Sequence, residues 1–168
     1  MISKTATLFK VSAISLSLMA CAQSASATSE ATINVGENPV SIQQDDIKMY
    51  NKAEDGQTRH VIALSPLANE DDARIEIRLS KEIMADCNVR GWSGKLTTET
   101  VEGWGYSYQV FQPYEAVATT LMACPEPAEL KKMYSQPLEL QHYNSKRPIV
   151  FYTDSNVDVD VRVWTPNK

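Results

Sequence analysis

The sequence has few of the residues that enzymes and metal sites require. Its 168 residues include only two histidines, three cysteines and six glycines. His60 and His142 lie far apart, and no H-x-x-x-H, C-x-x-C, G-x-S-x-G or glycine-rich phosphate-binding motif occurs. We therefore expect a protein that is not an enzyme and uses no metal or cofactor, with both histidines at the surface.

The sequence also lacks a long apolar run. Its most apolar stretch, residues 11–22, is too short to span a bilayer. It follows Lys4 and Lys10 and precedes the small residues Ala25 and Ala27, an arrangement typical of a cleaved export signal. A short buried helix is the alternative. We predict a signal peptide over residues 1–27.

The four residues that end at Cys21 allow a second interpretation, because Leu-Met-Ala-Cys resembles a lipoprotein signal. Cys21 would then be acylated and would become the first residue of the mature chain, although Met19 fits that pattern poorly. A single lipidated terminus would tether the domain without changing its fold. Both interpretations imply export, and only the second implies attachment to a membrane.

Basic residues are too few for nucleic-acid binding. The chain has 16 lysines and arginines against 21 acidic residues. Removing residues 1–27 removes Lys4 and Lys10 and no acidic residue, so the mature balance is 14 minus 21, or −7. Because binding to nucleic acid needs a basic surface, this balance argues against it.

Only two cysteines remain in the mature domain, whether Cys21 is removed or lipidated. Cys87 and Cys124 would meet in an oxidising compartment, where an isolated pair is typical of a disulfide. Two buried free thiols are the alternative. Closing so long a loop would contribute roughly 4 kcal/mol at most by the chain-entropy estimate.

Alternation of apolar and polar residues after Asn51 is typical of half-buried antiparallel strands. The strands expected are residues 61–64, 74–80, 106–111, 149–152 and 157–163. The fold class is therefore all-β, a single antiparallel sandwich or open barrel with long surface loops. This domain is expected to cover residues 51–168.

Other segments depart from the strand pattern. Residues 126–133, with Pro127 near their start, favour a short helix. Residues 28–50 are mostly polar without periodicity, and we expect them to form a flexible N-terminal arm. Turns are expected at residues 54–56, 93–94 and 153–156.

Two segments are candidates for function. Residues 117–125 are apolar and uncharged, which fits either a buried strand or an exposed loop held at its end by Cys124. Residues 103–108 are rich in aromatic side chains, which fits either a core strand or an exposed recognition patch. A carbohydrate-binding face would use such aromatic residues as well.

Six short motifs resemble the ecotin family, in that family's order and at nearly its spacing. They are DCN at 86–88, GKL at 94–96, EGWGY at 102–106, MACP at 122–125, YNSK at 143–146, and NVDV with RVW between 156 and 164. The similarity extends from about residue 50 to residue 164. Each motif alone is weak, but six in register are specific.

The resemblance implies a periplasmic inhibitor of trypsin-fold serine proteases of the trypsin, chymotrypsin and elastase types. Such inhibitors present a substrate-like loop to the protease. The matching positions place Leu121 at P1 and Met122 at P1′, and a Cys87–Cys124 disulfide would hold the loop. The loop residues are Ala118, Thr119, Thr120, Leu121, Met122 and Ala123.

The resemblance further implies a homodimer formed through the C-terminal strand, residues 156–164, in which each protease touches both inhibitor chains. A secondary protease-binding surface would come from Trp104, Gly105, Tyr106 and Ser107 together with His142, Asn144, Lys146 and Arg147. Two other functions are carried as alternatives. They are an envelope carbohydrate- or ligand-binding domain that uses Trp104, Tyr106 and Tyr108, and a structural envelope lipoprotein.

Overall fold

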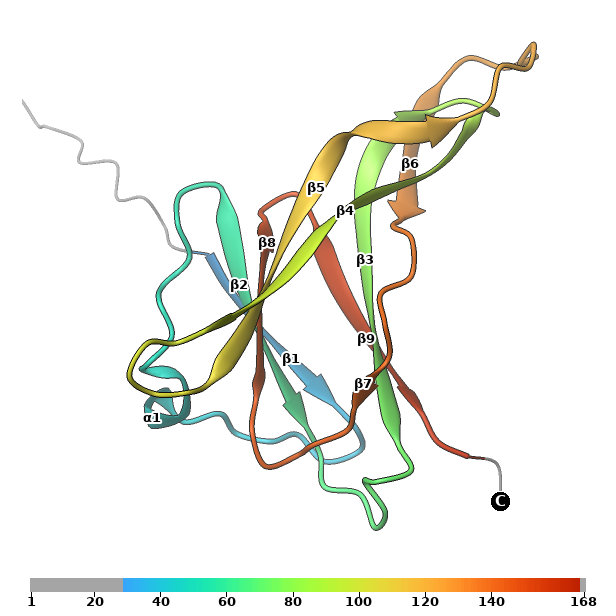
Figure 1. Ribbon diagram of the computed structural model, residues 1–168. Helices are drawn as coiled ribbons and strands as arrows, with labels where there is room; N and C mark the ends of the chain where they lie inside the picture. Colours follow the sequence, from blue (N-terminus) through green and yellow to red (C-terminus); the bar gives the residue numbers. More distant parts are fainter. Residues whose placement is uncertain (1–28, 167–168) are drawn as a thin grey trace, which may run out of the picture.

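Figure 1 shows a two-layered body of β-strands from which a narrow arm projects. The computed structural model describes residues 29–166. The elements are β1 (Ser29–Val35), α1 (Gln44–Ile47), β2 (Gln57–Leu64), β3 (Arg74–Ala85), β4 (Val89–Thr100), β5 (Ser107–Thr119), β6 (Glu129–Tyr134), β7 (Gln141–His142), β8 (Ile149–Asp154) and β9 (Asp158–Trp164). The predicted all-β fold class is confirmed.

Two sheets make up the sandwich. One sheet has the strand order β1-β2-β8-β5-β4. The other is built around β3, with β9 along one edge and with β6 and β7 following one another along the other. Within residues 29–166, no helix is long and apolar enough to cross a membrane.

The main core lies between the two sheets. In β3, Ile75, Ile77 and Leu79 are buried and pack in one cluster with Trp92 of β4 and Phe111 of β5. The alternation along residues 74–80 thus predicted the buried face correctly, because successive side chains of a strand point to opposite faces.

The strand β2 is buried on both faces, which explains its continuous apolar run. Ile62 faces the main core, whereas Val61 joins a smaller cluster with Ile47, Tyr50 and Tyr152. This second cluster lies where α1 and the residues after it cover the five-stranded sheet. Tyr108 of β5 and Tyr106, just before that strand, also pack against this cluster.

The prediction of a helix over residues 126–133 is wrong. Residues 129–134 form β6, which pairs antiparallel with residues 80–85 of β3. Local propensity favoured the helix, but the free edge of β3 provides backbone partners. The Trp92 indole also donates a hydrogen bond to the Met133 carbonyl oxygen at 2.7 Å, which holds β6 in place.

The turn expected at residues 93–94 is also wrong, because both residues lie inside β4. The register with β5 shifts between Trp92 and Gly94, so the strand bulges there. A Cβ atom at Gly94 would collide with the Phe111 ring and the Gln112 carbonyl oxygen. Glycine marks a close backbone approach here and not a chain reversal. The turns expected near residues 54–56 and 153–156 are present.

Two further expectations differ from the structure. Residues 29–35, assigned to an unpatterned arm, form β1, which pairs in parallel with β2 and turns Ala31, Ile33 and Val35 inward. His60 is only 5% exposed, and its Nε2 lies 2.9 Å from the Thr153 hydroxyl. His142 is exposed, as predicted. The predicted signal peptide and Cys21 lie outside the described residues.

Candidate functional site

The segment around Leu121 is an exposed loop at the tip of the arm, not a buried strand. β5 ends at Thr119, and the chain then runs through the tip to Pro125 (Figure 1). The Leu121 side chain is 100% exposed and Met122 is 53% exposed. A fully exposed leucine contributes no burial to the fold, so its side chain is free to contact another molecule.

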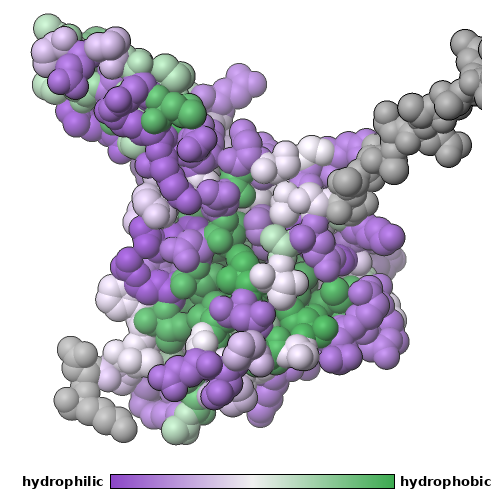
Figure 2. All heavy atoms as spheres, turned by 180° about the vertical axis from the view of Figure 1, so that it is seen from behind, coloured by the Kyte–Doolittle hydropathy of each residue, from purple (hydrophilic) through white to green (hydrophobic). Residues whose placement is uncertain are grey.

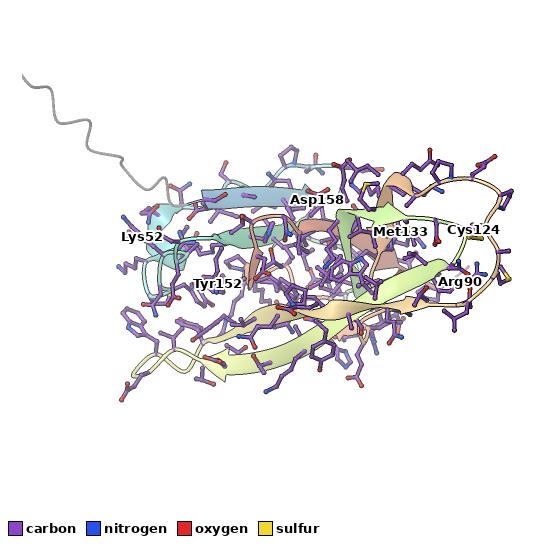
Figure 3. All side chains as sticks on the ribbon, turned by 90° about the horizontal axis from the view of Figure 1, so that it is seen from above. Lys52, Arg90, Cys124, Met133, Tyr152 and Asp158 are labelled. Atoms are coloured by element: carbon purple, nitrogen blue, oxygen red, sulfur yellow. A yellow bond between two sulfur atoms is a disulfide. The ribbon has the colours of Figure 1, made fainter. Side chains whose placement is uncertain are left out.

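A disulfide ties this loop to the turn beside it, which confirms the predicted pairing. Cys87, in the turn between β3 and β4, is bonded to Cys124 over a sequence separation of 37 residues. Figure 3 shows Cys124 at the end of the arm, near Arg90 of β4. The loop is therefore covalently fixed three residues after Leu121.

Asn88 holds the loop on both sides of Leu121. Its side-chain oxygen accepts hydrogen bonds from the Met122 amide at 2.6 Å and the Thr120 hydroxyl at 3.0 Å. Its amide nitrogen donates to the Met122 carbonyl oxygen at 3.0 Å, and its own carbonyl oxygen accepts from the Thr120 amide at 3.0 Å. The backbone beside Leu121 is thus fixed while the leucine side chain is left free.

Asp86 in turn orients Asn88. The Asp86 carboxylate accepts hydrogen bonds from the Asn88 backbone amide at 2.8 Å and from its side-chain amide at 3.1 Å. These bonds favour the charged carboxylate, so they lower the pKa of Asp86 below its ordinary value. Sequence reasoning assigned no role to Asn88, although it stood in the DCN motif beside Cys87.

A second group of exposed residues lies at the turn between β4 and β5. The Val101 carbonyl oxygen accepts hydrogen bonds from the amides of Trp104 and Gly105, both at 3.2 Å. Gly103 and Gly105 have φ angles of 75° and 71°, in the left-handed region that favours glycine. This tight reversal displays Trp104, which is 54% exposed.

The loop between β7 and β8 is anchored by alternate residues. The buried Tyr143 hydroxyl donates to the Ser65 carbonyl oxygen at 2.5 Å, and the Ser145 hydroxyl donates to the Glu70 carboxylate at 2.6 Å. The hydrogen bonds from Ser145 lower the pKa of Glu70. The residues between and after these anchors face solvent, namely Asn144, Lys146 and Arg147.

These two loops meet in space. The Arg147 guanidinium lies 5.1 Å from the Tyr106 ring centroid, and the Trp104 and Tyr106 rings stack at 6.3 Å between centroids. Ser107, His142 and Asn144 border one hollow of about 240 Å³ beside them. The structure therefore brings together the residues that the sequence placed on a secondary surface.

The two candidate surfaces lie at opposite ends of the molecule. The β4–β5 turn and α1 lie at the end of the body away from the arm (Figure 1). The 13 residues of β5 join one surface to the other. At about 3.3 Å per residue, such a strand spans about 40 Å. Among residues 29–166, no group of three or more potential metal ligands is present.

Comparison with known proteins agrees with this arrangement. The family model named Ecotin matches residues 46–166. The chain is 37% identical over 147 residues to a protein named Ecotin from Yersinia enterocolitica, covering 84% of this chain and 88% of that protein. Ecotin from Serratia proteamaculans is 36% identical over 151 residues, covering 88% of this chain and 86% of that protein.

A third relative, Ecotin from Yersinia pestis, is 38% identical over 122 residues, covering 70% of this chain and 72% of that protein. The family match includes the arm, both loops and β9. The loop at Leu121, the disulfide and strands β2 to β9 all lie within it. This chain belongs to the ecotin family, whose members inhibit serine proteases and are not enzymes.

Proposed function

We propose that this protein inhibits trypsin-fold serine proteases by inserting residues 118–123 into the active site, with Leu121 as P1. One observation carries the proposal. The Leu121 side chain is fully exposed, while the backbone on both sides of it is held by Asn88 and the disulfide. A substrate-like inhibitor needs this combination, because the S1 pocket must receive a free side chain on a rigid backbone.

Rigidity also explains how a substrate-like loop can inhibit. The protease serine would attack the Leu121 carbonyl carbon and release the Met122 amino group. Asn88 donates a hydrogen bond to the Met122 carbonyl oxygen, and the disulfide joins Cys124 to Cys87. The new amino terminus at Met122 therefore stays beside the acyl group. Attack by that amine on the acyl-enzyme reforms the peptide bond and regenerates the serine. Rejoining then competes with release of cut inhibitor.

Leucine at P1 sets an order of preference among proteases. A chymotrypsin-like apolar pocket accepts it well, and an elastase-like pocket accepts it with some crowding. Trypsin has an aspartate at the base of its pocket, and leucine leaves that carboxylate without a cation. Trypsin should therefore be inhibited least tightly through this loop alone.

A dimer would let both surfaces act on one protease. Because the arm and the secondary surface lie about 40 Å apart along β5, one chain is poorly placed to use both. In support, β9 pairs only with β3 among the described strands, so its outer edge can accept a second copy. Val159, Val161 and Val163 pack against the main core from this edge strand but are only partly buried.

The surface supports the same proposal. Figure 2 shows apolar side chains gathered across the middle of the body seen from behind. An apolar area on a monomer is typical of a protein interface.

We infer export of the inhibitor to the periplasm after removal of residues 1–27, with lipidation of Cys21 as the alternative route that would hold it at a membrane.

Inhibition constants for P1 variants test the proposal. Leu121→Asp places an unpaired carboxylate in an apolar pocket and loses the burial of leucine, a change of at least about 3 kcal/mol. Inhibition of chymotrypsin should therefore weaken by about 100-fold or more. Leu121→Arg should improve inhibition of trypsin, because a guanidinium can pair with the pocket aspartate.

Leu140→Asp is the matched control, since Leu140 is also exposed but lies away from the arm. It should change inhibition by less than about threefold, as surface substitutions usually do. Unchanged inhibition of chymotrypsin by Leu121→Asp would reject Leu121 as P1.

A further inference from the structure

A groove runs beside the secondary surface, and one of its walls comes from the N-terminal segment. Its volume is about 410 Å³. Ile42, Asp45 and Asp46 line one side, and Trp104, Lys146 and Arg147 line the other. The second side consists of residues already proposed to contact the protease, so any protease seated there also faces the N-terminal wall.

Most of this wall lies before the part of the chain that matches the family. The family match begins at residue 46, and residues 29–45 precede it. The segment is nevertheless built firmly into the fold. β1 pairs with β2 over seven residues, and Ile33 and Val35 pack against the main core.

The end of the segment is anchored as well. Ile47 and Tyr50 are buried in the second cluster. Arg59 of β2 donates hydrogen bonds to the carbonyl oxygens of Tyr50 at 3.2 Å and Asn51 at 3.1 Å, and it forms an ion pair with Glu30. The wall is therefore preorganised, so a partner would not have to order it.

The two walls carry opposite charge. Lys146 and Arg147 make the far wall basic. On the N-terminal wall, Asp45 and Asp46 outnumber Lys48, so that wall has a net charge of −1. Asp45 has only an exposed ion pair with Lys48 at 3.1 Å, and one oxygen of Asp46 accepts from the Gln43 amide at 3.0 Å. Both carboxylates retain free acceptor capacity, and Trp104 adds an apolar surface to the far wall.

We propose that the N-terminal wall is a third protease-contacting element, which selects proteases that present a lysine or arginine to Asp45 and Asp46. The inference rests on the proposed secondary surface and names the chemistry of its partner. The occupant is a surface loop of the same protease whose active site is blocked by the arm of the other inhibitor chain.

The test compares a cationic and an anionic trypsin, which have the same S1 chemistry. The double variant Asp45→Asn/Asp46→Asn keeps an acceptor oxygen for the Gln43 amide and removes both charges. Inhibition of the cationic trypsin should weaken by about 3- to 10-fold, as expected for two exposed ion pairs. The anionic trypsin should be affected little, and high salt should abolish the difference.

Glu54→Gln/Asp55→Asn is the matched control, because it removes the same charge from an exposed turn at the opposite end of β2. An equal loss with the control would mean that net charge steers the encounter, and would overturn the proposal. Equal inhibition of both trypsins by wild type and the double variant would also overturn it.

If the proposed inhibition through the secondary surface is itself wrong, the inhibition constants follow a different pattern. Wild type would then fail to inhibit either trypsin, or Trp104→Ala would leave both inhibition constants unchanged. If Trp104→Ala weakens inhibition of both trypsins and only the Asp45/Asp46 variant discriminates between them, the third element is supported.

Discussion

Replacing Asn88 with alanine tests whether inhibition depends on loop rigidity. The change removes three side-chain hydrogen bonds to the residues beside Leu121, which involve the Met122 amide, the Met122 carbonyl and the Thr120 hydroxyl. It also removes a weaker one to the Cys124 sulfur. The Thr120 amide keeps its bond to the Asn88 backbone, and the disulfide stays in place. The loop should therefore remain attached to the body but sample more conformations.

The size of the effect follows from those three bonds. A net hydrogen bond contributes about 0.5–1.5 kcal/mol, and the groups released in an exposed loop can bond to water instead. Restoring the order on binding should then cost about 1–3 kcal/mol, which corresponds to a 5- to 150-fold weaker inhibition constant. The bond between Leu121 and Met122 should also be hydrolysed faster, because the released amine is held less well.

Two measurements read out this prediction: the inhibition constant for chymotrypsin, and the rate at which the cut inhibitor accumulates by mass spectrometry. Asn69→Ala is the control, since it removes an exposed asparagine from the loop between β2 and β3. Asn88→Asp should be intermediate, because it keeps the acceptor for Met122 and loses the donor. An Asn88→Ala variant that inhibits as tightly as wild type, with no faster cleavage, would refute the reasoning.

Four further predictions concern stability and assembly. Gly94→Ala should lower the free energy of unfolding by about 1–3 kcal/mol, because the added methyl group overpacks against Phe111; an unchanged denaturation midpoint would argue against the close approach. Burial lowers the pKa of His60 from 6.5 to about 4, with the Asp158 carboxylate opposing the shift, so the unfolded state takes up a proton first as the pH falls. Stability should therefore decline between pH 6.5 and about 4, and denaturant titrations should find this slope smaller in His60→Gln. Val161→Glu should convert the proposed dimer to monomer in sedimentation velocity and weaken inhibition; because Val161 also packs against the main core, the comparison is made at a temperature where the variant's denaturation curve shows it folded. A fully inhibitory wild-type monomer at micromolar concentration would contradict the proposed dimer. Thiol titration of the unfolded, unreduced mature protein should find neither Cys87 nor Cys124 free; two reactive thiols would conflict with the disulfide.

Local patterns predicted the strands well where one face is buried. Alternation revealed β3 and β9, because side chains in a strand point alternately to the core and to solvent. The same alternation of Ala31, Ile33 and Val35 was present in β1, but it was short and surrounded by polar residues. The six motifs were enough to indicate the family and to single out the loop at Leu121 as a candidate site.

Local reasoning failed where a distant partner decided the outcome. Residues 129–134 have helical propensity, yet they form β6 because the free edge of β3 lies beside them. Glycine is a residue type common in turns, but Gly94 lies at a bulge in β4, where it allows a close approach to Phe111. His60 is polar, yet it is buried because side chains pack against both faces of β2.

The sequence by itself determined the fold class, the cysteine pair and the family, because each depends on residue types and their spacing along the chain. Only the tertiary structure decided the contacts of Asn88 and the position of residues 40–46. Asn88 meets Met122 across 34 positions, and Asp45 faces the loops at residues 104 and 147 across a groove. No local pattern encodes such contacts, since they arise when strands distant in sequence are packed together.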